Sequence, residues 1–416
     1  QVTATNVTLR TSQGYGGGIG SVATPLRVDV ERSFDFRPNG EFNVQLVGSG
    51  APNNVDLTIG VAPTGANYVG TLTRAGAIAL DVSANDATVT VNNFNVTSGF
   101  NTPIYGQTPD ISVYVPNGNL TVTSMAVPMG DQVGFASCIF YYCGVSILGM
   151  PVSVGASGSL AVVSFTRQSG GTYGKTTSFF SNDSAVTLGA ISGSRDSINA
   201  SADTGIALTG NLTTLGSASL TNYSTGDIVI GGTGINTAGG GTVSVTNYGS
   251  GAIRAAADTA GLEVTAGGAA NLYAGNIDTA GFVNPFDVSA NSVSLTGVGA
   301  SSTIGHTGAP VIANTTNLTI NAGGKFNVDT GAVDLINLGV TASPTGVGTG
   351  GLAQVASNGT TYGFASDGSN FTLANWTAPA AQFAGGTLSF TTTAGNVTLN
   401  NIDFSASNGS LSVRTN

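Results

Sequence analysis

Short runs in which apolar and small polar residues alternate recur along the chain from Gly205 onward, separated by Gly, Asn, Ser or Asp. A period of two places alternate side chains on the two faces of a β-strand, and runs of four or five residues are typical strands. No sustained period of 3.6 residues is present, so we expect few helices. The clearest runs are Gly205–Leu208, Asp227–Ile230, Thr242–Thr246, Gly261–Thr265, Asn317–Ile320, Lys325–Val328, Thr387–Phe390, Asn396–Leu399 and Ser410–Val413.

Some of these runs belong to longer repeats. Residues 262–271 and 318–327 share the pattern L-x-[V/I]-x-A-G-G-x-x-N, and the triplet Thr-Asn-Tyr occurs at both 221–223 and 246–248. Short strands without crossover helices form sandwiches, propellers or solenoids. Turns of only a few residues and repeated motifs favour the solenoid. The prediction is therefore an all-β chain wound as a parallel β-helix with roughly 20 residues per coil, in which Val, Leu, Ile and Phe point inward and Thr, Ser and Asn outward.

The pattern is less regular toward the N-terminus. Residues 1–140 are predicted to be a β-rich region, for which a β-helix with irregular coils is favoured over a small β-sandwich. Residues 141–416 are predicted to be parallel β-helix with clearer repeats.

The tail of the chain resembles a known family. Residues 386–401 and 409–413 are similar to the repeats of filamentous haemagglutinin-type exoproteins, which are exported by two-partner secretion, and related repeats occur in autotransporter passengers. The resemblance covers roughly residues 184–416. It implies a right-handed parallel β-helix, secretion to the cell surface of a Gram-negative-type bacterium, and an outer-membrane secretion partner. The family's Asn-Pro-Asn secretion element has no full match, because residues 37–40 and 115–118 lack the leading Asn.

Composition narrows the choice of partners. The 416 residues include 62 Gly, 41% are apolar, and only 8% are charged, with a net charge of −10. The apolar fraction is enough to form a core, unlike that of a disordered chain. Lys175 and Lys325 are the only lysines, and no basic cluster is present, so nucleic acid is not an expected partner.

Residues 124–167 differ from the rest of the chain. They contain all three methionines and both cysteines, and no charged residue lies between Asp131 and Arg167. Three interpretations remain open: a transmembrane helix, a partner-binding protrusion, or ordinary coils filled with apolar side chains. Cys138 and Cys143 are candidates for a local disulfide, with two reduced buried thiols as the alternative. The candidate interface residues are Met125, Met129, Phe135, Ile139, Phe140, Tyr141, Tyr142, Ile147, Leu148 and Met150.

The residues that catalysis needs are scattered. Acidic side chains are spread thinly along the chain, and His306, the only histidine, lies in a turn-like Ile-Gly-His-Thr-Gly sequence. Two cysteines far from His306 are too few for a zinc site. We therefore expect no enzyme activity and assign no catalytic residue, metal site or cofactor.

Function is expected to depend on contact. The leading expectation is a surface adhesin or stalk that touches host-cell or bacterial surfaces or glycans. The alternative is a structural subunit that binds copies of itself in an extracellular filament or surface layer.

Overall fold

The computed structural model describes most of the second half of the chain and the strands of the first half. The residues described are 2–10, 24, 26–37, 44–47, 55–61, 77–83, 87–91, 94–96, 110–115, 118–127, 132–135, 145–148, 152–167, 175–237, 239–256, 262–278, 285–306, 308–347 and 353–416.

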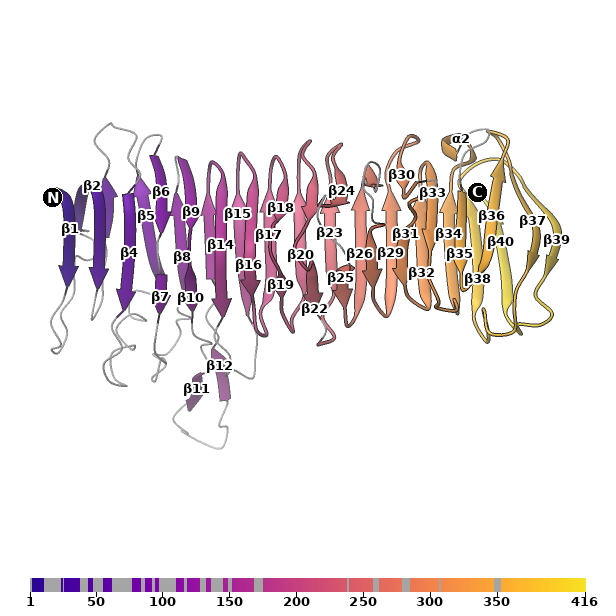
Figure 1. Ribbon diagram of the computed structural model, residues 1–416, viewed down its shortest axis with the longest axis horizontal. Coiled ribbons are helices and arrows are strands. Elements are labelled where there is room, and N and C mark those ends of the chain that lie inside the picture. The colour runs from indigo at the N-terminus through magenta and orange to yellow at the C-terminus, as the bar shows by residue number, and fades with distance from the viewer. Residues whose placement is uncertain are drawn as a thin grey trace, which may run out of the picture. The chain divides into compact units, whose positions relative to one another are not determined.

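The protein is an all-β solenoid of stacked parallel coils, as predicted (Figure 1). The described residues form strands and turns with one short helix, and the coil spacing is about 25 residues. The spacing is near the predicted 20 residues but somewhat longer. The chain divides into two compact units. Unit 1 comprises Gln1–Asp203 and Leu212–Gly216, and unit 2 comprises Thr204–Asn211 and Ser217–Asn416.

The described elements of unit 1 are all strands. They are β1 (Val2–Arg10), β2 (Leu26–Arg37), β3 (Val44–Val47), β4 (Val55–Val61), β5 (Ala77–Ser83), β6 (Ala87–Val91), β7 (Phe94–Val96), β8 (Asp110–Val115), β9 (Gly118–Val122), β10 (Met125–Val127), β11 (Gln132–Phe135), β12 (Val145–Leu148), β13 (Val152–Ala156), β14 (Leu160–Arg167), β15 (Thr176–Ser181), β16 (Val186–Ser192), β17 (Ser197–Ala202) and β19 (Leu212–Thr213).

Parallel pairing dominates unit 1. One sheet runs β5-β8-β13-β15-β17, and another runs β4-β6-β9-β14-β16-β19. The strands of residues 1–127 also pair in parallel with one another, beginning with β1 on β2. In contrast, β11 and β12 form a separate two-stranded antiparallel sheet.

Unit 2 contains the remaining strands and one short helix among the described residues. They are β18 (Ile206–Leu208), β20 (Ala218–Asn222), β21 (Ile228–Ile230), β22 (Ile235–Thr237), β23 (Val243–Asn247), β24 (Ala252–Ala255), β25 (Leu262–Ala266), β26 (Ala269–Ala274), β27 (Asn276–Asp278), β28 (Asp287–Ser289), β29 (Ser292–Gly297), β30 (Thr303–Ile304), β31 (Val311–Asn314), β32 (Asn317–Ala322), β33 (Lys325–Asp329), β34 (Asn337–Ala342), α2 (Pro344–Val347), β35 (Ala353–Ser357), β36 (Thr360–Ser366), β37 (Phe371–Thr377), β38 (Thr387–Thr392), β39 (Val397–Asp403) and β40 (Ser410–Thr415).

The coils of unit 2 contribute to three parallel sheets. The first is β20-β23-β26-β29-β32-β34-β38-β40. The second is β18-β21-β24-β27-β30-β33-β35, and the third is β22-β25-β28-β31-β33. In the first sheet, Leu220, Val245, Leu272, Leu295 and Ile320 stack in register and are at most 1% exposed. These inward columns form the core, and burying each such side chain contributes about 1.5–3 kcal/mol.

An insertion interrupts the coils near the C-terminus. The registered step from Asn337 in β34 to Thr387 in β38 covers 50 residues, which is twice the usual coil. The extra residues form α2 and the antiparallel run β35-β36-β37, and β37 then pairs in parallel with β39. A dense aromatic core fills this region, with Trp376 packed edge-on against both Tyr362 and Phe364.

The repeat at 262–271 and 318–327 marks a corner of the coil. Its first copy spans β25 and β26, which belong to the third and first sheets, whereas its second copy spans β32 and β33, which belong to the first and second. Both copies bend at Gly-Gly. A Cβ on Gly324 would lie 2.1 Å from the Ser302 carbonyl oxygen, so the neighbouring coil leaves room only for glycine.

Candidate contact surface

The first sheet of unit 2 presents a face that is almost free of charge. Its two outward columns are Ser219, Ser244, Asn271, Ser294, Thr319, Gly339, Ser389, Ser412 and Thr221, Thr246, Tyr273, Thr296, Asn321, Thr341, Thr391, Arg414. Eleven of these sixteen residues are Ser or Thr, and Arg414 is the only charged residue in the eight strands. We call these two columns the hydroxyl face. Stacking in register at about 4.8 Å per strand makes it a regular array of hydrogen-bonding groups.

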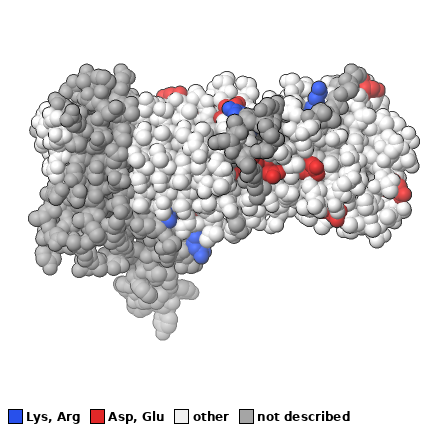
Figure 2. All heavy atoms as spheres, in the orientation of Figure 1, with Lys and Arg blue, Asp and Glu red and all other residues white. Residues whose placement is uncertain are grey.

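The charged strand residues of unit 2 other than Arg414 lie outside this sheet. Arg254 and Asp278 are neighbours in the second sheet, and Glu263 and Asp287 lie on adjacent strands of the third. Asp227, just before β21, forms an ion pair with Arg254 at 2.6 Å in which both side chains are about one-third exposed. Figure 2 shows one side of the molecule, on which Lys, Arg, Asp and Glu are few and scattered among uncharged residues.

Three tyrosines form a ladder at one edge of the hydroxyl face. Tyr223 directly follows β20, Tyr248 directly follows β23, and Tyr273 lies in β26. The rings of Tyr223 and Tyr248 stack with centroids 5.9 Å apart and planes 14° apart, and the Tyr273 ring centroid is 5.8 Å from that of Tyr248, with the planes at 56°. Tyr223 and Tyr248 are 61% and 62% exposed. Aromatic side chains of this size are usually buried in large part, so the ladder is an exposed contact feature.

Buried asparagines hold the corner from which the tyrosines project. Asn222 and Asn247 stack in register, and the Asn222 amide donates to Oδ1 of Asn247 at 3.1 Å. Both amides also donate to the Gly226 carbonyl oxygen at 2.8 Å. The two side chains are at most 1% exposed. They satisfy backbone carbonyls where the coil turns, because buried carbonyls that lack a donor are costly.

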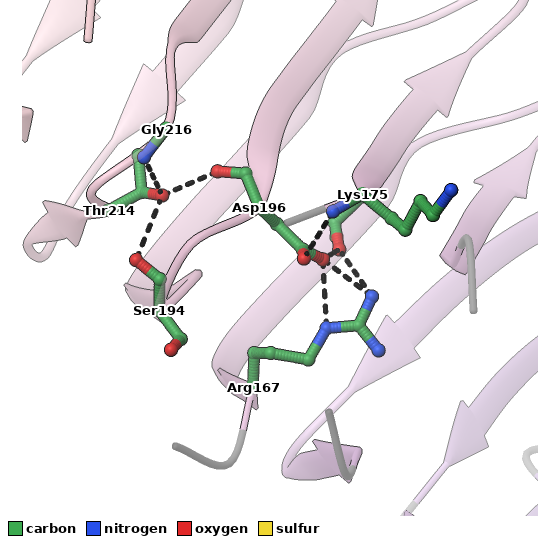
Figure 3. A network of polar contacts seen from close by, with 7 residues as sticks. Arg167, Lys175, Ser194, Asp196, Thr214 and Gly216 are labelled. Atoms are coloured by element: carbon green, nitrogen blue, oxygen red, sulfur yellow. Dashed lines mark hydrogen bonds and ion pairs between the residues drawn. The ribbon is translucent and has the colours of Figure 1, made fainter. Parts of the chain in front are cut away.

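A corner of unit 1 is held by charge instead (Figure 3). Arg167, the last residue of β14, donates from Nε to Oδ2 of Asp196 at 2.8 Å, and Thr177 donates to the same oxygen at 2.7 Å. The backbone N–H of Lys175 donates to the other carboxylate oxygen at 2.9 Å. The Arg167 and Asp196 side chains are both 1% exposed. Thr214 extends the network by donating to the Asp196 carbonyl oxygen at 2.5 Å.

Two acidic residues lie on adjacent strands of the third sheet. Glu263 is 1% exposed, and one of its oxygens accepts the backbone N–H of Asp287 at 2.6 Å. Burial raises the pKa of Asp287. In the part of the chain that the structure describes, His, Cys, Asp and Glu form no group of three or more that could hold a metal ion.

The structure places only part of the predicted interface segment. The Met125 side chain lies in the core, 2% exposed. Phe135 lies in β11, and Ile147 and Leu148 lie in β12, so these stretches form antiparallel strands and not the helix that was one interpretation of 124–167. Outside the described residues are Met129, Cys138, Ile139, Phe140, Tyr141, Tyr142, Cys143 and Met150.

His306 lies in a tight turn, as its sequence context indicated. Its backbone N–H donates to the Ala309 carbonyl oxygen at 2.8 Å, and the Ala309 N–H returns a bond at 3.1 Å. The carbonyl of His306 accepts a bond from the Asn327 amide. Among the described residues, no helix is long and apolar enough to cross a membrane.

Sequence reasoning missed the ladder and the ionic corner. The Thr-Asn-Tyr repeat was a usable signal for the ladder, because its two copies lie 25 residues apart, one coil, and stack in register. Comparisons with protein-family models, with curated proteins and with solved structures found no match to this chain. The solenoid is consistent with β-helical exoproteins. This agreement in fold supports the resemblance to filamentous haemagglutinin-type exoproteins only at the level of the fold.

Proposed function

We propose that this chain is the β-solenoid part of a secreted bacterial surface adhesin of the filamentous haemagglutinin type. In this proposal it is displayed on a Gram-negative-type cell after export with an outer-membrane secretion partner. It acts by contact with host-cell or bacterial surfaces or their glycans, without catalysis or a cofactor. The observation that carries the proposal is the hydroxyl face, on which eight registered strands present Ser, Thr and Asn with one charge.

The chemistry of this face suits adhesion to polar surfaces. A repeated array lets many weak hydrogen bonds act together, so avidity exceeds the affinity of any single contact. The near absence of charge on this face limits the local repulsion that would otherwise oppose its approach to a charged cell surface. The fold contributes a scaffold on which the contact groups keep a fixed spacing.

The test attaches the purified chain to beads and counts the beads retained by epithelial cells and by bacterial cells under flow. Ser294→Glu with Thr319→Glu adds two negative charges to the hydroxyl face. The matched control, Ser289→Glu with Asn314→Glu, places the same charges on half-buried outward positions of β28 and β31, in the third sheet. We expect the first variant to lose most retention and the control to keep it.

Two results would contradict the proposal. Wild-type retention of the hydroxyl-face variant would show that the hydroxyl face makes no contact. If the chain without beads sediments as regular polymers and binds no cell, the structural filament would be favoured instead.

A further inference from the structure

The tyrosine ladder is a different kind of surface from the rest of the hydroxyl face. Tyr223 and Tyr248 expose most of their rings, although apolar ring surface is favourably removed from water. Nearly parallel rings with centroids 5.9 Å apart are offset, which leaves part of each ring face uncovered. The Tyr273 ring is tilted by 56° relative to the Tyr248 ring, so it faces a second direction.

On the first sheet, the neighbours of the rings are polar and uncharged. Thr221 and Thr246 stack in register and outward beside Tyr223 and Tyr248, and Tyr273 continues the same column. Asn271, which is exposed, lies two residues before Tyr273 on the same side of β26. The platform therefore combines aromatic surface, hydroxyl groups and an amide, and no charged residue belongs to the three strands that carry it.

The ladder is also held in place before any ligand arrives. The Asn222 and Asn247 side chains beneath it are buried and bonded to each other and to the Gly226 carbonyl oxygen. A Cβ on Gly249, just after Tyr248, would lie 1.4 Å from the Ser224 carbonyl oxygen, so the turns of adjacent coils are closely packed. A rigid corner lowers the entropy that binding would otherwise cost.

We propose that Tyr223, Tyr248 and Tyr273, with Thr246 and Asn271, bind a neutral glycan chain that lies along the ladder. Pyranose rings offer C–H surfaces for the tyrosine rings and hydroxyl groups for Thr and Asn. The absence of charge in the three strands matches a glycan without carboxylate or sulfate groups. Antibody combining sites likewise combine rigid tyrosine contact area with adaptable hydrogen bonding from Ser and Asn. This inference deepens the proposed function and rests on its premise that the chain contacts glycans.

The experiment titrates the full chain with cellohexaose, mannohexaose and a heparin hexasaccharide by calorimetry and tyrosine fluorescence. We expect at least one neutral hexasaccharide to bind and the sulfated one not to bind. Tyr248→Ala should weaken binding about fivefold to tenfold, the loss expected for one aromatic contact, and Tyr248→Phe should keep most of it. Leu399→Ala is the matched control, because Leu399 lies in β39, outside the first sheet, and is 48% exposed, and it should change nothing.

The outcomes separate this inference from the proposed function. Binding of neither neutral hexasaccharide, or equal binding by wild type and Tyr248→Ala, overturns the inference even if the chain still retains cells. Ladder-dependent oligosaccharide binding without cell retention upholds the inference and contradicts the adhesin. Self-association that Tyr248→Ala abolishes, without oligosaccharide binding, would overturn the inference and assign the ladder to a second copy of the chain.

Discussion

Two corners of the solenoid meet the same requirement with different chemistry. In unit 1, Arg167 and Asp196 form a buried ion pair, which Thr177 completes. In unit 2, Asn222 and Asn247 form a buried amide pair. Each satisfies polar groups that a turn leaves inside the protein. Amides therefore provide this support without charge, and the corner built from them is the one that carries the exposed tyrosines.

The stability cost of losing one partner also differs between the two corners. A buried ion pair is balanced only while both partners are present, because either charge alone is strongly penalised in the interior. A buried amide that loses its partner leaves a neutral group, which costs less. Substitutions at the ionic corner should therefore cost more stability than substitutions at the amide corner, and exposed pairs should cost least.

Asp196→Ala should give the largest loss of stability. It leaves the Arg167 guanidinium buried without its carboxylate, and we expect unfolding to become easier by about 3–5 kcal/mol. Equilibrium unfolding in urea measures this change. The double variant Arg167→Met with Asp196→Leu should recover much of the loss, because apolar residues remove the unpaired charge. A loss below about 1 kcal/mol in Asp196→Ala would contradict a buried pair.

Asn247→Ala should have an intermediate effect. It removes the acceptor of the Asn222 amide and a donor to the Gly226 carbonyl oxygen, so we expect a loss of about 1–3 kcal/mol in the same urea assay. Asn271→Ala, on the exposed side of the next coil, is the control and should stay within about 0.5 kcal/mol of wild type. Similar losses in both variants would show that the Asn247 amide is not part of a buried corner.

Arg254→Met should have a small effect. The pair with Asp227 is as short as a buried one, 2.6 Å, but both side chains are about one-third exposed. We expect a loss of less than about 1 kcal/mol, which shrinks further as salt is added. A loss as large as that of Asp196→Ala would mean that burial does not determine how much each ion pair contributes to stability.

The lowered pKa of Asp367 should have the weakest of the four effects on stability, and its loss should be confined to low pH. The backbone N–H groups of Ser369 and Asn370 donate to its carboxylate and lower its pKa to about 2. Because the folded pKa lies below the ordinary value of 3.8, the stabilisation is complete above that value and is lost as pH falls through about 2. Carboxyl carbon shifts followed by NMR across this acid range measure the titration. A midpoint at the ordinary value would show that the turn does not form these bonds.

The alternation of apolar and polar residues was enough to predict the fold. Inward columns such as Leu220 and Val245 follow from a period of two, and short Gly-rich turns favoured a solenoid. Coil length was harder to predict because the loops differ. The registered steps include one of 20 between Asn317 and Asn337 and one of 27 between Asn276 and Thr303. The repeat at 262–271 and 318–327 does not give the coil length. Its two copies share a Gly-Gly corner, but this corner lies at different places in the coil.

The contact features depend on register, which a single sequence does not reveal. Arg167 and Asp196 are 29 residues apart, and nothing local to either one indicates the other. Once the coil length of 25 residues is known, the Thr-Asn-Tyr repeat does predict that Asn222 stacks on Asn247 and Tyr223 on Tyr248. The hydroxyl face required the same register across all eight strands.

The register of the hydroxyl face can be measured as a distance between two of its positions. Ser244 and Ser389 are far apart in sequence but only five registered steps apart in the first sheet, through Asn271, Ser294, Thr319 and Gly339. Both are replaced by spin-labelled cysteines in a chain whose Cys138 and Cys143 are changed to Ser, and their separation is measured by pulsed electron spin resonance. We predict a narrow distribution that corresponds to about 24 Å between the two backbone positions, from five steps of about 4.8 Å. A clearly different or broad distribution would contradict the registered face on which the adhesin and the glycan platform both depend.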